Sequence, residues 1–217
     1  SAHFISALDD IAWILNCRGQ DVEYNPVFLA HLFIDTSRTV LFIDDIKLSK
    51  ELHQLLAQDQ ITVLPYTQTE FFLSQLSQQH VLIDPAKVSI LHTQSIQKNN
   101  QLVQDINPST LFKSRKHATE ITHIRNAMTK DGVALSHFFY WLETALTQNQ
   151  PINELTIDEK ITAFRAEQVG FIGLSFSTIA GFNANGALPH YRATKDSYSQ
   201  IQKDGLLLID SGAQYHD

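Results

Sequence analysis

The feature that most constrains the fold of this chain is a stretch from about His117 to Gln148 in which apolar residues recur every three or four positions. The apolar members are Ile121, Ile124, Met128, Val133, Leu135, Phe138, Phe139, Leu142 and Leu146. This spacing places one broad apolar stripe along a long helix. The aromatic run from Phe138 to Trp141 is best explained by packing of that helix into a core.

Residues 1–113 alternate between helical and extended patterns. Apolar spacing predicts helices at residues 7–16, 49–58, 68–78 and 88–97, and strands at residues 27–34, 39–43, 61–66 and 80–84. Such alternation predicts an α/β domain in which helices surround a mixed sheet, and the first two strands predict a hairpin. A polar connector from about Asn107 to Arg115 ends the pattern, so the predicted boundary separates residues 1–113 from residues 114–217.

The chain changes character after the long helix. Thr156 and Glu159 have the spacing of a capping box and predict a second helix that ends near Gly170. Residues 173–181, 187–193 and 205–210 have β-like patterns separated by turn residues. The second domain is therefore predicted to begin with helices and to end in the first strands of an antiparallel sheet, an α+β arrangement.

Charge and hydropathy narrow the classes of partner. The 217 residues carry a formal net charge of -7, which disfavours binding to nucleic acid or to an anionic membrane surface. No stretch reaches the roughly 20 apolar residues of a membrane span, and the single cysteine, Cys17, is expected to be a buried structural thiol. These features predict a soluble cytoplasmic protein. Ser1 in place of an initiator Met, and Asp217 in an unfinished strand and turn, are expected to mark the cut ends of a longer protein.

Asp210 is the strongest candidate for chemistry. It ends a run of four apolar residues and precedes Ser211 and Gly212, and a half-buried carboxylate there needs a proton, a partner or a metal. Two other interpretations stay open. The pattern also presents the catalytic acid of aspartic proteases, although two preceding helices do not fit their nearly all-β fold. Alternatively, the side chain only caps a turn.

His190 is the second candidate, in a glycine-rich segment predicted to be a strand. A histidine shortly before a carboxylate strand can shuttle a proton or donate a hydrogen bond near neutral pH, although a lone histidine is more often structural. His117, His123 and His137 lack the i, i+4 spacing of a helical zinc pair, so they are expected on a polar helix face. Nucleotide-binding, nucleophile-elbow and Cys-x-x-Cys motifs are absent from the sequence.

Several ordered segments together resemble one family. The stretch from Ala7 to Asp21, followed by Asn25-Pro-Val-Phe28, resembles the middle domain of the three-domain cytosolic aminopeptidases P, which are pita-bread metallopeptidases. Further matches follow in order at residues 130–134, 141–143, 174–179, 185–187, 190–191 and 208–215. The interval from His190 to Asp210 is also the one between the active-site histidine and the first metal-binding aspartate of this subgroup.

The resemblance implies a fold, a reaction and two site residues. The fold would be an α/β creatinase-like middle domain (a mixed sheet with helices), followed by the truncated N-terminal part of a pita-bread α+β catalytic domain. The reaction would be removal of the N-terminal residue from peptides whose second residue is proline, with two divalent metal ions, usually Mn²⁺, as cofactors. Asp210 would be the first metal-binding aspartate, and His190 would bind or polarise the substrate. The family is commonly dimeric.

The departure from the family has a direct consequence. Its second metal-binding aspartate is expected in a Gly-Thr-Thr-Asp segment a few residues past Asp217, and the remaining ligands are expected later still. One carboxylate cannot hold two dications, so the 217 residues alone are expected neither to bind the metal pair nor to cleave peptides. Two alternatives remain for the parent protein: a non-catalytic pita-bread binding module, and a related prolidase or creatinase-type hydrolase.

Overall fold

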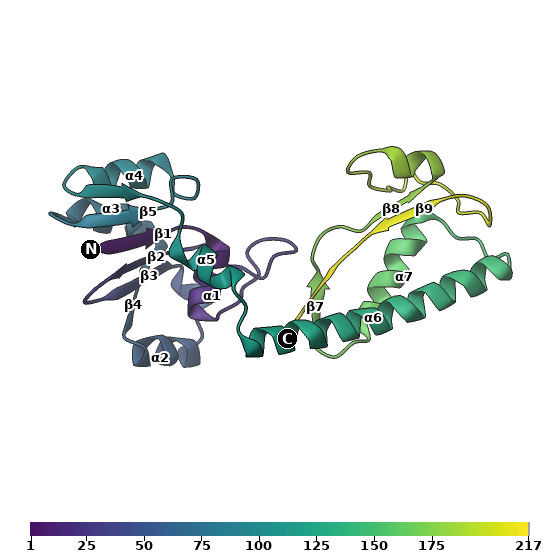
Figure 1. Cartoon of the computed structure of the whole chain (residues 1–217), viewed down its shortest axis with the longest axis horizontal. Helices are drawn as coiled ribbons and strands as arrows, with labels where there is room; N and C mark the ends of the chain where they lie inside the picture. Colours follow the sequence, from purple (N-terminus) through teal and green to yellow (C-terminus); the bar gives the residue numbers. More distant parts are fainter. Residues whose placement is uncertain (217) are drawn as a thin grey trace. The chain divides into compact units, whose positions relative to one another are not determined.

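The computed structural model describes residues 1–216 and divides into two compact units (Figure 1). Unit 1 comprises residues 1–22 and 26–116, and unit 2 comprises residues 23–25 and the chain from His117 onward. The two units divide between Lys116 and His117, three residues after the predicted domain boundary, which stays a prediction. Asp217, the expected cut end, lies outside the described residues.

Unit 1 is built on one mixed sheet. Its strands are β1 (Ala2–Ile5), β2 (Ala30–Asp35), β3 (Thr39–Ile43), β4 (Ile61–Pro65), β5 (His80–Ile83) and β6 (Gln101–Gln104). They lie in the order β4-β3-β2-β1-β5-β6; β2 is antiparallel to β1 and β3, and the other neighbours are parallel. The predicted mixed sheet and the predicted hairpin are confirmed.

Helices cover both faces of this sheet (Figure 1). Alternate strand residues point to opposite faces, so Phe4 and Phe33 pack in one apolar cluster and Ile5 and Leu32 in the other. The first cluster is completed by α3 (Thr69–Gln75) and α4 (Ile90–Gln97), and the second by α1 (Leu8–Leu15) and α2 (Lys50–Gln58). These four helices lie where the apolar spacing predicted them.

The predicted polar connector is wrong, because residues 108–114 form a helix, α5 (Pro108–Ser114). Pro108 occupies the first helical turn, where its missing N–H costs nothing. The Asn107 side chain donates to the buried carboxylate of Asp10 at 3.0 Å, and Lys113 Nζ lies 2.8 Å from the same carboxylate. These bonds hold α5 against α1, so the segment is part of the packed unit.

Unit 2 packs two long helices against short antiparallel strand pairs. The helices are α6 (Ala118–Thr147) and α7 (Glu154–Ala166). The strands are β7 (Phe171–Leu174), β8 (Ile179–Phe182), β9 (Leu207–Asp210) and β10 (Ala213–Tyr215), and η3 (Asn183–Ala187) is a 3-10 helix. β8 pairs with β9 and β7 with β10, both antiparallel, which confirms the predicted first strands of an antiparallel sheet.

Several local predictions in unit 2 are wrong. The predicted strand at residues 187–193 is wrong: residue 187 ends η3, and residues 188–193 are turns and irregular chain, because the carbonyls of Asn185 and Leu188 accept hydrogen bonds that close successive turns there. The cap of α7 is Asn153, whose side chain accepts from the N–H of Thr156, so Thr156 is not the capping residue. The apolar stripe of α6 is only partly buried: Phe138 is in the core, whereas Met128 is 65% exposed.

Candidate metal and substrate site

Asp210 is the last residue of β9 and pairs with Ile179 of β8. Along β9 the side chains alternate, so Leu207 and Ile209 pack into the core of unit 2 while Leu208 and Asp210 lie on the opposite, exposed face. Among residues 1–216 no group hydrogen-bonds to the Asp210 carboxylate. The turn-capping interpretation therefore has no hydrogen bond to support it, and the acid is more exposed than the sequence predicted.

The chain packs so closely after Asp210 that position 212 requires a glycine. The Gly212 carbonyl accepts from the N–H of Ser175 at 3.0 Å, which joins the turn after β9 to the end of β7. A Cβ on Gly212 would lie 2.2 Å from Ser175 Oγ and 3.1 Å from Phe176 Cε1. Only glycine fits there without displacing its neighbours, so the Asp-Ser-Gly sequence fixes how the chain leaves β9.

His190 lies in a turn and its side chain is exposed. Its φ is 56°, in the left-handed region that a residue with a Cβ enters at a cost. The next residue, Tyr191, is buried, and its N–H donates to the Leu188 carbonyl at 3.3 Å. The side chain of His190 therefore points outward from its turn, while the next residue, Tyr191, is held in the interior.

The anchor is Glu154, a residue that the sequence analysis missed. Glu154 is 1% exposed, and its carboxylate accepts from Phe182 N at 2.7 Å, Ser199 N at 2.8 Å and Tyr191 Oη at 2.7 Å. Asn185 Nδ2 adds contacts of 3.1 and 3.2 Å to the two carboxylate oxygens. A buried carboxylate is stable only when hydrogen bonds of this kind replace its lost water.

The protonation states of this cluster follow from its contacts. Burial raises the pKa of the Glu154 carboxyl, but the hydrogen bonds, first from Phe182 N–H and then from Tyr191, outweigh it and hold that pKa below its ordinary value. Burial and the hydrogen bond to Glu154 raise the pKa of Tyr191 to about 12. At neutral pH the tyrosine is therefore a neutral donor to an ionised acid.

The metal-binding capacity of the described residues is incomplete. Within residues 1–216 no three His, Cys, Asp or Glu side chains are close enough together to hold a metal ion. Asp210 offers an exposed carboxylate with no hydrogen-bond partner among the described residues, of the kind that hard divalent cations accept. Two histidines at and within α6 have structural contacts instead. His117 caps α6 in a capping box with Glu120, and the His137 ring contacts Phe164.

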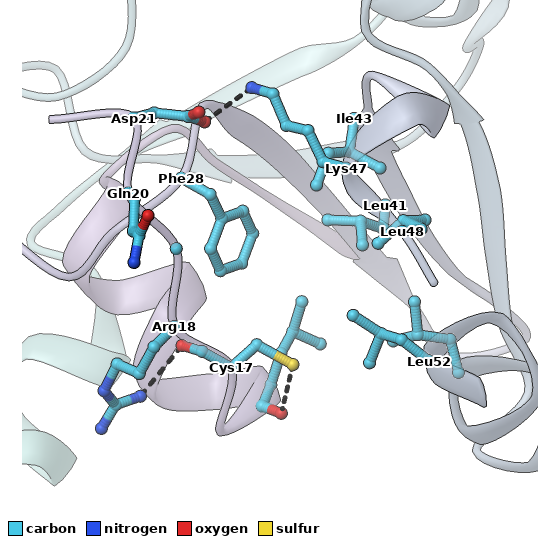
Figure 2. A pocket seen from close by; sticks show the side chains of 13 residues that line it. Cys17, Arg18, Gln20, Asp21, Phe28, Leu41, Ile43, Lys47, Leu48 and Leu52 are labelled. Atoms are coloured by element: carbon cyan, nitrogen blue, oxygen red, sulfur yellow. Dashed lines mark hydrogen bonds and ion pairs between the residues drawn. The ribbon is translucent and has the colours of Figure 1, made fainter. Parts of the chain in front are cut away.

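Unit 1 contains a separate cleft of about 350 Å³, shown in Figure 2. Its walls are apolar side chains from the α1 end, β3 and α2, and its rim carries Arg18 and an ion pair between Lys47 Nζ and Asp21 Oδ2 of 2.6 Å. Cys17 lies on the wall, half-buried where the sequence predicted full burial, and its thiol donates to the Leu15 carbonyl at 3.3 Å. Burial raises the thiol pKa more than Arg18 lowers it, so the thiol is protonated at neutral pH and is a poor nucleophile.

The mixed sheet with helices on both faces, and the unit of helices and short antiparallel strand pairs that follows it, match the fold class of creatinase-like metallopeptidases. Residues 1–120 match the creatinase/prolidase N-terminal domain, and residues 122–217 match metallopeptidase family M24. The chain belongs to the creatinase/prolidase family, with an M24 metallopeptidase segment after its N-terminal-type domain.

Curated relatives match almost the whole chain. Xaa-Pro aminopeptidase 1 of Dictyostelium discoideum is 38% identical over 219 aligned residues, which cover 98% of this chain and 34% of the relative. Xaa-Pro aminopeptidase ApepP of Drosophila melanogaster is 35% identical, with 98% of this chain and 35% of the relative covered. The resemblance to aminopeptidases P is thereby confirmed, and the chain spans about a third of the length of these relatives.

Solved structures agree on the fold. The crystal structure of an X-prolyl aminopeptidase from Caenorhabditis elegans, described as a cytosolic enzyme with a di-nuclear active site, matches with a TM-score of 0.92 and 27% identity. That match covers 99% of this chain and 36% of the other. The N-terminal domain of the FACT subunit SPT16 from Cicer arietinum matches with a TM-score of 0.63 at 13% identity, over 99% of this chain and 57% of the other, and so shares the fold alone.

Proposed function

We propose that this chain is part of a metal-dependent aminopeptidase that releases the N-terminal residue from peptides with proline in the second position. The observation that carries the proposal is similarity along 98% of the chain to Xaa-Pro aminopeptidases, combined with an unpaired carboxylate at Asp210 on an exposed sheet face. The alternative, a non-catalytic binding module on the same fold, predicts no metal-dependent turnover, so the experiment below separates the two.

The proposed roles follow from the resemblance to the family, and the chemistry of the side chains is compatible with them. Asp210 would be the first ligand of a pair of divalent ions, and oxygen-rich ligands suit Mn²⁺. Such a pair, when bound, supplies an activated water and polarises the scissile carbonyl. His190, exposed and free of any hydrogen bond within residues 1–216, would donate a hydrogen bond to the substrate.

The remaining ligands would come from sequence outside these 217 residues, because the described part of the chain holds no cluster of three metal-binding side chains. We therefore expect the 217-residue chain on its own to neither retain a metal pair nor cleave peptides. The proposed enzyme is the whole protein, since this chain aligns with only 34% and 35% of the length of the two relatives.

The similar proteins also suggest a cellular location and an oligomeric state for the proposed enzyme. In the described chain no helix has the length and apolar character that a membrane crossing requires. We propose a cytosolic enzyme, as its Caenorhabditis elegans neighbour is described, acting on Xaa-Pro peptides as a homodimer. Size-exclusion chromatography with light scattering on the whole protein tests the dimer.

The deciding experiment compares the whole protein with its Asp210→Ala variant. With Mn²⁺ the whole protein is expected to release arginine from an Arg-Pro-Pro peptide, and Asp210→Ala to lower kcat/KM at least about a thousandfold. An exposed carboxylate elsewhere in unit 2, Glu159, provides the matched control, because Glu159→Ala should leave turnover unchanged. Full turnover by Asp210→Ala, or none by the unaltered protein with any divalent metal, would refute the proposal.

A further inference from the structure

Glu154 connects segments that are far apart in the sequence. Its partners are Phe182 at the end of β8, Asn185 in η3, Tyr191 beside His190, and Ser199. Asn185 Nδ2 also lies 3.0 Å from Tyr191 Oη and 2.9 Å from Ser199 Oγ, so the partners bind one another as well. One buried carboxylate thus fixes both ends of residues 182–199 and the turn between them.

His190 lies in the middle of this held segment. Its backbone is in a left-handed conformation, while its exposed side chain makes no hydrogen bond within residues 1–216. A strained backbone persists only where the surrounding structure over-determines it. The Glu154 bond to Tyr191 supplies that constraint, and no described residue of unit 2 hydrogen-bonds to the imidazole.

The start of the held segment lies on the face of the strand pair that carries Asp210. A Cβ on Gly181 would lie 2.8 Å from the Gly186 backbone, and a Cβ on Gly186 would lie 3.5 Å from Leu208 Cβ. Leu208 and Asp210 are two residues apart in β9 and therefore share one face. Two glycines thus let η3 rest directly on the β8–β9 pair, on the Asp210 side.

We propose that Glu154 is the positioning residue for His190, which it holds through Tyr191 and Asn185 above the sheet face that carries Asp210. This inference rests on the proposed function, in which His190 contacts the substrate. A charged carboxylate is required because both of its oxygens face backbone N–H donors, from Phe182 and from Ser199. A glutamine would oppose one of these N–H groups with its own NH₂ group.

A double-mutant cycle in the whole, metal-loaded protein tests the proposal. Tyr191→Phe should lower kcat/KM for an Xaa-Pro peptide about tenfold in the unaltered protein but less than about twofold when His190 is already alanine. The matched control is Tyr215→Phe, which removes a similar hydrogen bond from a tyrosine to a carboxylate, that of Asp131. Tyr215→Phe should change kcat/KM by the same factor whether residue 190 is histidine or alanine. Multiplicative losses for Tyr191→Phe and His190→Ala would overturn the proposal.

Hydrogen exchange gives a readout that does not depend on turnover. In Tyr191→Phe the amides of residues 183–192 should exchange about tenfold faster, with the rest of unit 2 unchanged. Unchanged exchange at residues 183–192, or faster exchange throughout unit 2, would overturn the proposal. If the unaltered protein cleaves no Xaa-Pro peptide, the proposed function fails, while the exchange data still decide whether Glu154 holds the His190 segment.

Discussion

The guanidinium of Arg165 binds both carboxylate oxygens of Asp131, with Nε to Oδ1 at 2.8 Å and Nη2 to Oδ2 at 3.1 Å. Arg165 is 1% exposed, so this bidentate pair joins α7 to α6 inside unit 2. The Tyr215 hydroxyl donates to the same carboxylate at 3.0 Å and adds β10. Asp131 therefore holds three elements of the unit together.

Removing Asp131 should unfold unit 2 more easily. Asp131→Ala leaves the Arg165 guanidinium buried without a counterion, which costs about 3 to 5 kcal/mol of unfolding free energy. Urea unfolding followed by Trp141 fluorescence, in a Trp13→Phe background, measures the change. Glu159→Ala, which removes an exposed carboxylate from α7, should change the same free energy by less than about 0.5 kcal/mol. Equal effects of the two substitutions would contradict the bidentate pair.

Gly212→Ala should strain the turn that follows Asp210, because its Cβ would collide with Ser175 Oγ at 2.2 Å. We expect a loss of about 1 to 3 kcal/mol in the unfolding free energy. Ser175→Ala removes the colliding oxygen, so the double variant Ser175→Ala/Gly212→Ala should recover at least about half of that loss. Thermal unfolding of the three variants decides the matter. No recovery in the double variant would mean that Phe176, 3.1 Å away, is the obstacle instead.

His31 makes unit 1 sensitive to mild acid. It lies on β2, 7% exposed, with Nδ1 2.9 Å from Ser6 Oγ and a buried Nε2 without a partner in the described chain. Burial, and secondarily the charge of His92, lower the pKa of its imidazole to about 4. Because His31 resists protonation in the folded state, the neutral imidazole contributes its full stabilisation above about pH 6.5. This stabilisation is lost as the pH falls towards 4.

The measurement is the unfolding free energy of unit 1 between pH 6.5 and pH 4, followed by Trp13 fluorescence in a Trp141→Phe background. The unaltered chain should lose about 2 kcal/mol over this interval. His31→Asn, whose side chain can still bond Ser6, should lose less than half of that amount. His80→Asn serves as the control, since His80 is exposed and its replacement should leave the acid loss intact. An equal loss in His31→Asn would locate the titration elsewhere.

Regular elements of the fold could be predicted because their signals are local. Apolar spacing gave α1 to α4, the β2–β3 hairpin and the mixed sheet, which lie where expected. β1 and β6 were not predicted; β6 (Gln101–Gln104) has only two apolar residues, which stand between glutamines and are too few for a strand pattern. α5 was missed because the residues from Asn107 to Arg115 were interpreted as a polar connector, although a proline in the first turn, here Pro108, favours a helix.

The site was only half predictable for a related reason. Asp210 and His190 stand out in short segments, so local sequence identified them as candidates. Glu154 does not, because an acid in the first turn of a helix already has a local explanation in the helix dipole. Its partners lie 28 to 45 residues further along the chain, and only the folded backbone brings them together.

Two tyrosines should make unit 2 lose stability in base. Burial and hydrogen bonds to Glu154 and Asp131 raise the pKa values of Tyr191 and Tyr215 to about 12. The folded state keeps these protons, so the stabilisation is complete below the unfolded value of about 10 and is lost as the pH rises towards 12. Tyr191→Phe should lower the unfolding free energy of unit 2 by about 1 kcal/mol at pH 8. Between pH 8 and pH 11 the variant should then lose less unfolding free energy than the unaltered chain. Tyr198→Phe, at an exposed position, should keep the full alkaline loss, and an unaltered loss in Tyr191→Phe would contradict this assignment.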